Sequence, residues 1–141
     1  MSKAKLTAIL GCEEIIFRLA LNAKAAMPHT TEAFLLRRSD NGKLSVYRLK
    51  KTTIESCLRR YNRPKGAFTL HTGRVRTVAY RGVPLDVVED EQPNDKCPGH
   101  ASVLHLPDPL KGDEAEEAER VATILRRQSR QVDTRGTSGK R

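Results

Sequence analysis

The feature that most constrains this chain is a strongly basic stretch from Arg37 to Arg81. It holds thirteen Lys or Arg residues and two acids, Asp40 and Glu55, a formal +11 that exceeds the +9 of the whole chain. Because each unpaired buried charge costs several kcal/mol or more, this stretch cannot be mostly buried. Its basic side chains must face water, an acidic partner or acidic residues elsewhere in the chain.

The remaining charge also falls in blocks. Residues 1–36 carry about +1, residues 86–119 carry −9 and residues 120–141 carry +6. The acidic block can neutralise the basic stretch inside the fold, or the two can lie on opposite faces and leave one open to a polyanion. The sequence leaves both alternatives open.

The length of 141 residues predicts one domain over residues 1–131, followed by a flexible basic tail over residues 132–141 that is poor in apolar side chains. A domain of this size buries about two thirds of its unfolded surface and needs no disulfide or metal for stability. Three scattered cysteines fit a reducing compartment, and the apolar run at residues 6–10 is shorter than the roughly 7–15 residues of a signal peptide. We therefore expect a cytoplasmic protein.

Short apolar runs between turn residues predict a sheet. The run at residues 15–21 predicts a strand, and those at 33–38 and 44–49 flank Asn41-Gly42, which is typical of a tight antiparallel hairpin turn. In the second arm, Leu44 and Val46 should share one face and Tyr47 the other. Further short strands are predicted at residues 67–70, 83–88 and 100–106.

Helical periodicity appears three times. Thr52 with Glu55 predicts a capping box at the start of a helix, and Thr72 is the expected N-cap of a helix over residues 73–80. Residues 113–131 have acids in the first turns and arginines in the last, as the helix dipole favours. The apolar stripes expected on the first and last of these helices are Ile54, Cys57, Leu58 and Tyr61, and Ala118, Val121, Ala122 and Leu125. The predicted fold is α+β, with a small mostly antiparallel sheet, two or three short helices and a long C-terminal amphipathic helix.

Several spaced fragments occur between residues 15 and 107: Phe17-Arg18, Ala33-Phe34, Leu44-Ser45-Val46, Gly73-Arg74-Val75-Arg76, Leu-Asp-Val-Val at 85–88, Pro-Gly-His-Ala at 98–101 and Leu106-Pro107. In this order they resemble a group of small uncharacterised bacterial proteins. The chain departs from that group at Glu91-Gln92 and at Lys96-Cys97. No activity is assigned to the group, so the resemblance implies a bacterial, soluble α+β protein and nothing about its chemistry.

The cysteines and histidines suggest two kinds of reactive site. Zinc binding by Cys97, His100, His105 and His71 is disfavoured, because Cys97-x-x-His100 is only half a site and strand residues five apart point to opposite faces. We therefore expect no metal and no cofactor. If the protein is an enzyme, His71 and His100 are the first candidates for an acid–base pair that cleaves RNA. No spacing forces them to meet, so we favour a non-enzyme in which His100 hydrogen-bonds the backbone.

Binding is the better-supported function. Phosphate backbones attract dense positive surfaces through counterion release, and Tyr47, Tyr61 and Phe68 are candidates to stack on a base. We predict a small basic accessory protein that binds RNA or DNA non-specifically. The alternatives are an adaptor that docks on a protein partner through its C-terminal helix, and a histidine-dependent RNA-processing enzyme. The predicted nucleic-acid contacts are Arg37, Arg38, Arg48, Lys50, Lys51, Arg59, Arg60, Arg63, Lys65, Arg74 and Arg76.

Overall fold

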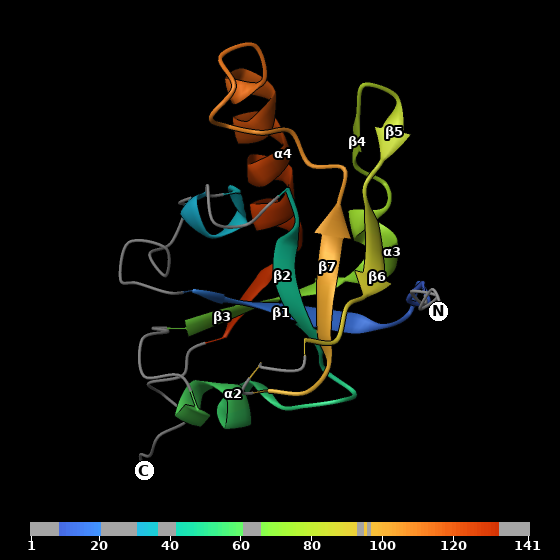
Figure 1. Ribbon diagram of the computed structural model, residues 1–141, viewed down its shortest axis with the longest axis vertical. Helices are drawn as coiled ribbons and strands as arrows, with labels where there is room; N and C mark the ends of the chain where they lie inside the picture. Colours follow the sequence, from blue (N-terminus) through green and yellow to red (C-terminus); the bar gives the residue numbers. More distant parts are fainter. Residues whose placement is uncertain are drawn as a thin grey trace, which may run out of the picture.

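The computed structural model describes residues 9–20, 31–36, 42–60, 66–92, 95 and 97–132. These residues form an antiparallel sheet with helices packed on both of its faces (Figure 1). In chain order the elements are β1 Ile15–Ala20, the 3-10 helix η1 Glu32–Phe34, β2 Leu44–Arg48, α2 Ile54–Arg60, β3 Gly66–His71, α3 Thr72–Val75, β4 Ala79–Tyr80, β5 Val83–Pro84, β6 Asp86–Glu89, β7 His100–Leu104, α4 Ala115–Gln128 and β8 Arg130–Val132. The predicted α+β class and mostly antiparallel sheet are confirmed.

The main sheet has six strands in the order β6-β7-β2-β1-β3-β8, and every neighbouring pair is antiparallel. The first strand of the chain therefore lies in the interior of the sheet, between β2 and β3. A separate two-stranded hairpin is formed by β4 and β5. Within the described residues, no helix is long and apolar enough to cross a membrane.

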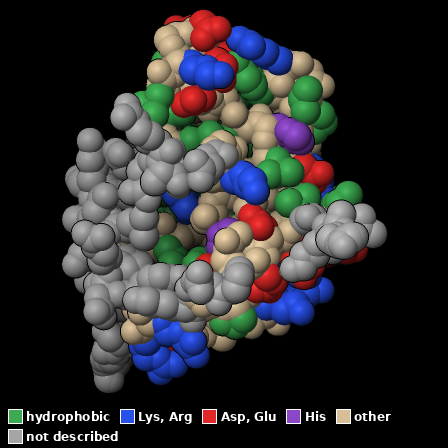
Figure 2. Space-filling view, viewed as in Figure 1, with side chains coloured by type: hydrophobic (Ala, Val, Ile, Leu, Met, Phe, Trp, Pro, Cys, Tyr) green, Lys and Arg blue, Asp and Glu red, His purple; other side chains and the backbone are tan. Residues whose placement is uncertain are grey.

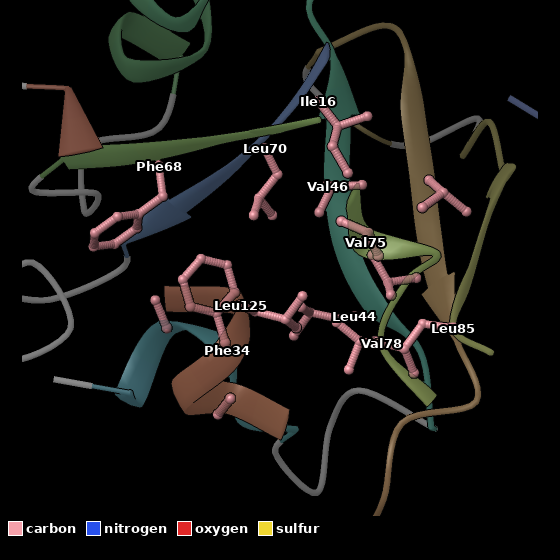
Figure 3. Close-up of a cluster of buried hydrophobic side chains, with 14 of the residues drawn as sticks. Ile16, Phe34, Leu44, Val46, Phe68, Leu70, Val75, Val78, Leu85 and Leu125 are labelled. Atoms are coloured by element: carbon pink, nitrogen blue, oxygen red, sulfur yellow. The ribbon is translucent and has the colours of Figure 1, made fainter. Parts of the chain in front are cut away.

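Strand alternation divides the core into two clusters. Ile16 and Val46 point to the face covered by α3, α4 and η1, where the larger cluster packs (Figure 3). Phe17 and Tyr47, one residue further along each strand, point to the opposite face, where α2 packs. The predicted faces of β2 are therefore confirmed.

The predicted hairpin between residues 33–38 and 44–49 is wrong. β2 already has β1 on one side and β7 on the other, so it has no free edge for a third partner. Residues 32–34 instead form η1, and Arg18 of β1 donates to the carbonyls of both Ala33 and Ser45, at 2.8 Å each. Residues 37–41 lie outside the described part of the chain.

The predicted helix over residues 73–80 is much shorter. α3 covers four residues, and its N-cap is His71, because Thr72, the predicted cap, is the first residue of the helix. The chain then forms β4 and turns through Arg81 and Gly82, whose positive φ angles of 54° and 78° match a two-residue hairpin turn. The predicted strand over residues 83–88 splits into β5 and β6 at Leu85, which is buried and donates its N–H to the carbonyl of Val78 at 2.8 Å.

The helix predicted after Thr52 is present, but it begins one residue later. The hydroxyl of Thr53 accepts the N–H of Ser56 at 3.0 Å, so Thr53 is the capping residue and no Thr52–Glu55 capping box forms. Cys57 is fully buried and the flanking apolar residues pack beside it, as the predicted stripe requires. Tyr61 lies outside the described residues.

α4 has 14 residues, fewer than the predicted range of 113–131. Its four predicted stripe residues are all buried. The helix ends because Ser129 is extended and the next three residues pair with β3 as β8. Residues 133–141, which make up nearly all of the predicted flexible tail, lie outside the described part of the chain.

Two glycines with positive φ provide a matched test of this packing. Gly42 has a φ of 79°, and a Cβ added there would meet no atom within 4 Å. A Cβ on Gly99, with φ of 83°, would lie 2.6 Å from Cβ of Lys51. Gly42→Ala should lower the free energy of unfolding by about 1 kcal/mol through backbone strain alone. Gly99→Ala should cost about 2–4 kcal/mol, because a steric clash adds to the strain. Urea unfolding measures both, and equal losses would contradict the packing described.

Candidate nucleic-acid interface

Arg48 is a predicted contact to nucleic acid, but the structure uses its side chain internally. Its Nε and Nη2 donate to the carboxylate of Glu14 at 2.5 and 3.1 Å, and its Nη1 donates to Glu89 at 3.0 Å. Only 10% of the Arg48 side chain and 6% of the Glu14 side chain are exposed. The hydrogen bond with Glu14 raises the pKa of Arg48, although burial opposes the shift. Arg48 therefore stabilises the fold and is not available to a polyanion.

Arg76 is also a predicted contact to nucleic acid, and its side chain is likewise used inside the fold. Its Nε donates to Asp86 at 2.8 Å, and its Nη2 donates to the carbonyls of Leu10 and Val87 at 2.5 and 3.3 Å. The guanidinium thereby joins the segment before β1 to the edge strand β6. Its position is set by the fold and leaves little of it for a ligand.

The acidic block neutralises part of the basic stretch, which answers the question that the sequence left open. Ion pairs within the described part of the chain join residues 86–119 to residues 37–81, and four of them are given below. The pairs of Arg48 and Arg76 are buried or half-buried. The other two are more exposed and contribute less to stability. The four pairs are Arg48–Glu89 at 3.0 Å, Arg76–Asp86 at 2.8 Å, Arg81–Asp113 at 3.6 Å and Lys43–Asp90 at 3.8 Å.

Several exposed residues of the basic stretch lie on α2 or on the connection that leads to it. Lys51 and Arg59 are exposed and have no ion pair within the described residues, and Arg60 is exposed beside them. Lys50 is 63% exposed, and its Nζ lies 3.9 Å from Glu14, whose carboxylate already binds Arg48. Figure 2 shows Lys and Arg side chains at the lower end of the molecule, where Figure 1 places α2. Arg37, Arg38, Arg63 and Lys65 lie outside the described residues.

The sheet beside α2 presents a further exposed surface. Paired residues of antiparallel strands share a face, so Thr69, His71 and Arg130 lie on the same face as Phe17, which α2 covers. His71 and Arg130 are nevertheless exposed and Thr69 is half-buried. α2 therefore leaves this end of its sheet face uncovered.

A hollow of about 460 Å³ lies at this uncovered end. Arg74, also a predicted contact, is exposed on α3 at its rim. Ile15 lines both this hollow and a neighbouring one of about 450 Å³ that is lined by Lys50 and by the acidic residues Glu13 and Glu14. The first hollow is lined by Ile15, Thr69, Leu70, His71, Arg74, Gln128, Ser129 and Arg130.

The predicted base-stacking residues are not available in the described part of the chain. Tyr47 is buried, and its hydroxyl donates to Asp95 at 2.8 Å. Phe68 is fully buried, with the guanidinium of Arg126 4.6 Å from the centre of its ring. Both prediction errors have one cause, since each ring is on a central strand that is covered by a helix or a loop.

The two candidate catalytic histidines do not meet. His71 ends β3 and His100 begins β7, and β1 and β2 lie between those strands. With adjacent strands about 4.8 Å apart, three spacings separate the two histidines by about 14 Å or more. Nδ1 of His100 lies 2.7 Å from the carbonyl oxygen of Asp90, which confirms its predicted backbone hydrogen bond at a strand start.

The remaining reactive groups do not form a site either. In the described ranges, no three His, Cys, Asp or Glu side chains are grouped closely enough to hold a metal ion. Cys57 and Cys97 are buried in the cluster under α2. Burial, with a hydrogen bond to Cys97, raises the pKa of Cys57 to about 12, so its thiol stays protonated and is a poor nucleophile.

Sequence reasoning misses two residues that shape this region. Glu14 is the buried partner of Arg48, and its only signal is a carboxylate directly before an apolar strand. Arg130 falls within the predicted C-terminal helix, although it begins β8. Hydrophobic periodicity does not distinguish the end of α4 from the start of β8, because β8 has only three residues.

Comparisons with protein families, with curated proteins and with solved structures found no match. A function for this protein is therefore inferred from the geometry and charge of the described residues.

Substitution of Arg48 should reveal its structural role. Arg48→Met leaves the carboxylate of Glu14 buried without its partner, so the free energy of unfolding should fall by about 3–5 kcal/mol. The same substitution at the exposed Arg59 is the control and should change it by no more than about 0.5 kcal/mol. Similar losses for both variants in urea unfolding would contradict the assignment.

The Arg76–Asp86 pair predicts a pH dependence. Burial opposes ionisation of Asp86, but hydrogen bonds from Arg76 and from the N–H of Val87 lower its pKa below the ordinary 3.8. The ion pair therefore contributes stability above about pH 4, which is lost as the pH falls through the pKa of the folded protein. Asp86→Asn should cost about 1–3 kcal/mol at pH 7, and this difference from wild type should shrink below pH 4. A difference that stays constant with pH in chemical unfolding would refute this role.

Proposed function

We propose that this protein binds nucleic acid without sequence preference, through a cationic surface formed by α2, the β2–α2 connection, the uncovered end of the sheet and the adjoining α3. One observation carries the proposal: these basic side chains stay exposed after the acidic block has paired with its share of the basic stretch. The described members of the cationic surface are Lys50, Lys51, Arg59, Arg60, Arg74 and Arg130.

The physical basis is the phosphate backbone. Each Lys or Arg that neutralises a phosphate releases condensed counterions, which favours binding whatever the base sequence. Since Tyr47 and Phe68 are buried, the proposal assigns them no role in stacking. Contacts to phosphate fix position and carry no sequence information, so binding should be non-specific.

A cytoplasmic setting is part of the proposal. Cys57 and Cys97 are both free thiols in one buried cluster, which fits a reducing compartment. In a bacterial cell, RNA and DNA are both present in that compartment.

The alternative, an adaptor that docks through a long C-terminal amphipathic helix, has less support. α4 buries its apolar stripe, including Val121 and Leu125, against the protein's own sheet. A partner on α4 would therefore meet mainly its charged face, with Glu117 and Arg120 paired at 2.8 Å. Such an interface would lack the buried apolar centre of a stable complex.

Salt dependence and a charge-matched pair of variants test the proposal. In the surface variant, Lys51, Arg59 and Arg60 are replaced by Ala. In the control variant, Lys43, Arg81 and Lys111 are replaced by Ala; each of these pairs with an acid of residues 86–119. Both variants lose the same net charge. Binding is measured by the fluorescence anisotropy of single-stranded RNA and DNA and double-stranded DNA of several sequences, all labelled at the 3′ end.

We expect wild type to bind all these sequences with similar affinity and to weaken steeply between 50 and 200 mM salt. The surface variant should lose about tenfold or more in affinity at low salt, and its slope of log affinity against log salt should be shallower by about 2–3, since each lost phosphate contact removes about 0.7–0.9. The control variant should bind more tightly than the surface variant. Equal binding by the two variants, or binding that salt does not weaken, would refute the proposal.

A further inference from the structure

We infer that the hollow between α3, the end of β3 and the start of β8 binds a phosphate monoester. That group occurs at the end of a nucleic-acid strand and on a free mononucleotide. The strand-end form of the inference rests on the proposed function, whereas the mononucleotide form does not.

The charge of the lining selects an anion. Arg74 and Arg130 come from different elements, are exposed, and have no ion pair within the described residues. His71 adds an imidazole, and none of the described residues that line the hollow is acidic. A monoester carries about −1.5 to −2 charge at pH 7, so two guanidiniums on separate walls match it better than they match a singly charged diester. Arginine also presents donors whose fork geometry fits phosphate oxygens.

The walls of the hollow are held in place before any ligand binds. Arg130 lies opposite Thr69 in the β3–β8 ladder. Nε2 of Gln128, at the end of α4, donates to the carbonyl of Arg74 at 3.1 Å and so links the two walls. Pre-organisation of this kind lowers the cost of binding.

The segment before β1 fixes α3 from the other side. The N–H groups of Thr72 and Gly73 donate to the carbonyls of Glu14 and Cys12 at 3.0 and 2.9 Å. A Cβ on Gly73 would lie 3.0 Å from the Cys12 carbonyl oxygen, so this close approach favours glycine. The backbone at Arg74, the next residue, is therefore held by two separate segments, the one before β1 and the end of α4.

The size of the hollow fits a nucleotide. About 460 Å³ lies in the range of roughly 300–1,000 Å³ that is usual for small-molecule sites. Ile15 and Leu70 add apolar surface beside the charged groups. Ile15 also lines the neighbouring hollow, where Lys50 lies beside the acidic residues Glu13 and Glu14.

The test compares ligands that differ only in the terminal phosphate. Two single-stranded 12-mers of one sequence, both labelled at the 3′ end, carry either a 5′-phosphate or a 5′-hydroxyl. Adenosine 5′-monophosphate and adenosine are compared by calorimetry. The hollow variant carries Arg74→Gln and Arg130→Gln. The charge-matched control carries Arg81→Gln and Lys111→Gln, at the β4–β5 turn and before α4, outside the hollow. Urea unfolding midpoints equal to wild type establish that each variant is folded.

We expect wild type and the control to bind the 5′-phosphate 12-mer about tenfold more tightly than the 5′-hydroxyl 12-mer, and the hollow variant to lose this preference. The surface variant of the preceding subsection should bind both 12-mers more weakly but keep their ratio. If only the mononucleotide binds, and the hollow variant loses it, the site is confirmed for a free ligand while the proposed function fails.

The inference is overturned if the two 12-mers bind equally and adenosine 5′-monophosphate gives no more heat than adenosine. It is also overturned if the hollow variant keeps the full preference. In both cases, salt-dependent binding of the 5′-hydroxyl 12-mer would leave the proposed function standing, so the two failures can be told apart.

Discussion

The buried ion pair between Arg48 and Glu14 is the interaction on which this arrangement depends. Arg48 ends β2, Glu14 directly precedes β1, and Glu89 ends β6, so three strands of the sheet meet at one guanidinium. A buried charge is tolerated only when it is paired and hydrogen-bonded, so these three residues fix one another's positions. The ion pair thereby holds the start of β1 next to the end of β2, where the connection to α2 begins.

From that point the basic residues divide into two groups with different roles. Arg48 and Arg76 lie inward and use carboxylates of the acidic block to join strands and the segment before β1. Lys51 and Arg59, on the connection and helix that follow β2, lie outward. Internal neutralisation and an open cationic surface, which the sequence presents as alternatives, therefore both occur in one fold.

Much of the local structure follows from sequence, because it depends on periodicity. Alternation assigns Val46 and Tyr47 to opposite faces of β2, and the helical stripe identifies Val121 and Leu125 as buried. Strand order does not follow, because β2 pairs with strands far from it in the chain and the Asn-Gly turn signal competes with them. The Glu14–Arg48 pair spans 34 residues, a separation at which the sequence gives no register. For the same reason, the sequence does not predict the hollow, which is lined by residues from both ends of the domain.

The placement of β8 has a consequence for the order in which the protein is completed. Arg130 is carried by the last described strand, whereas His71 and Arg74 are made some sixty residues earlier. During synthesis, His71 and Arg74 leave the ribosome before the strand that completes the hollow. Any molecule that binds only the finished hollow shifts the equilibrium toward the docked C-terminal strand by mass action. A ligand bound in the hollow would therefore hold the two ends of the domain together.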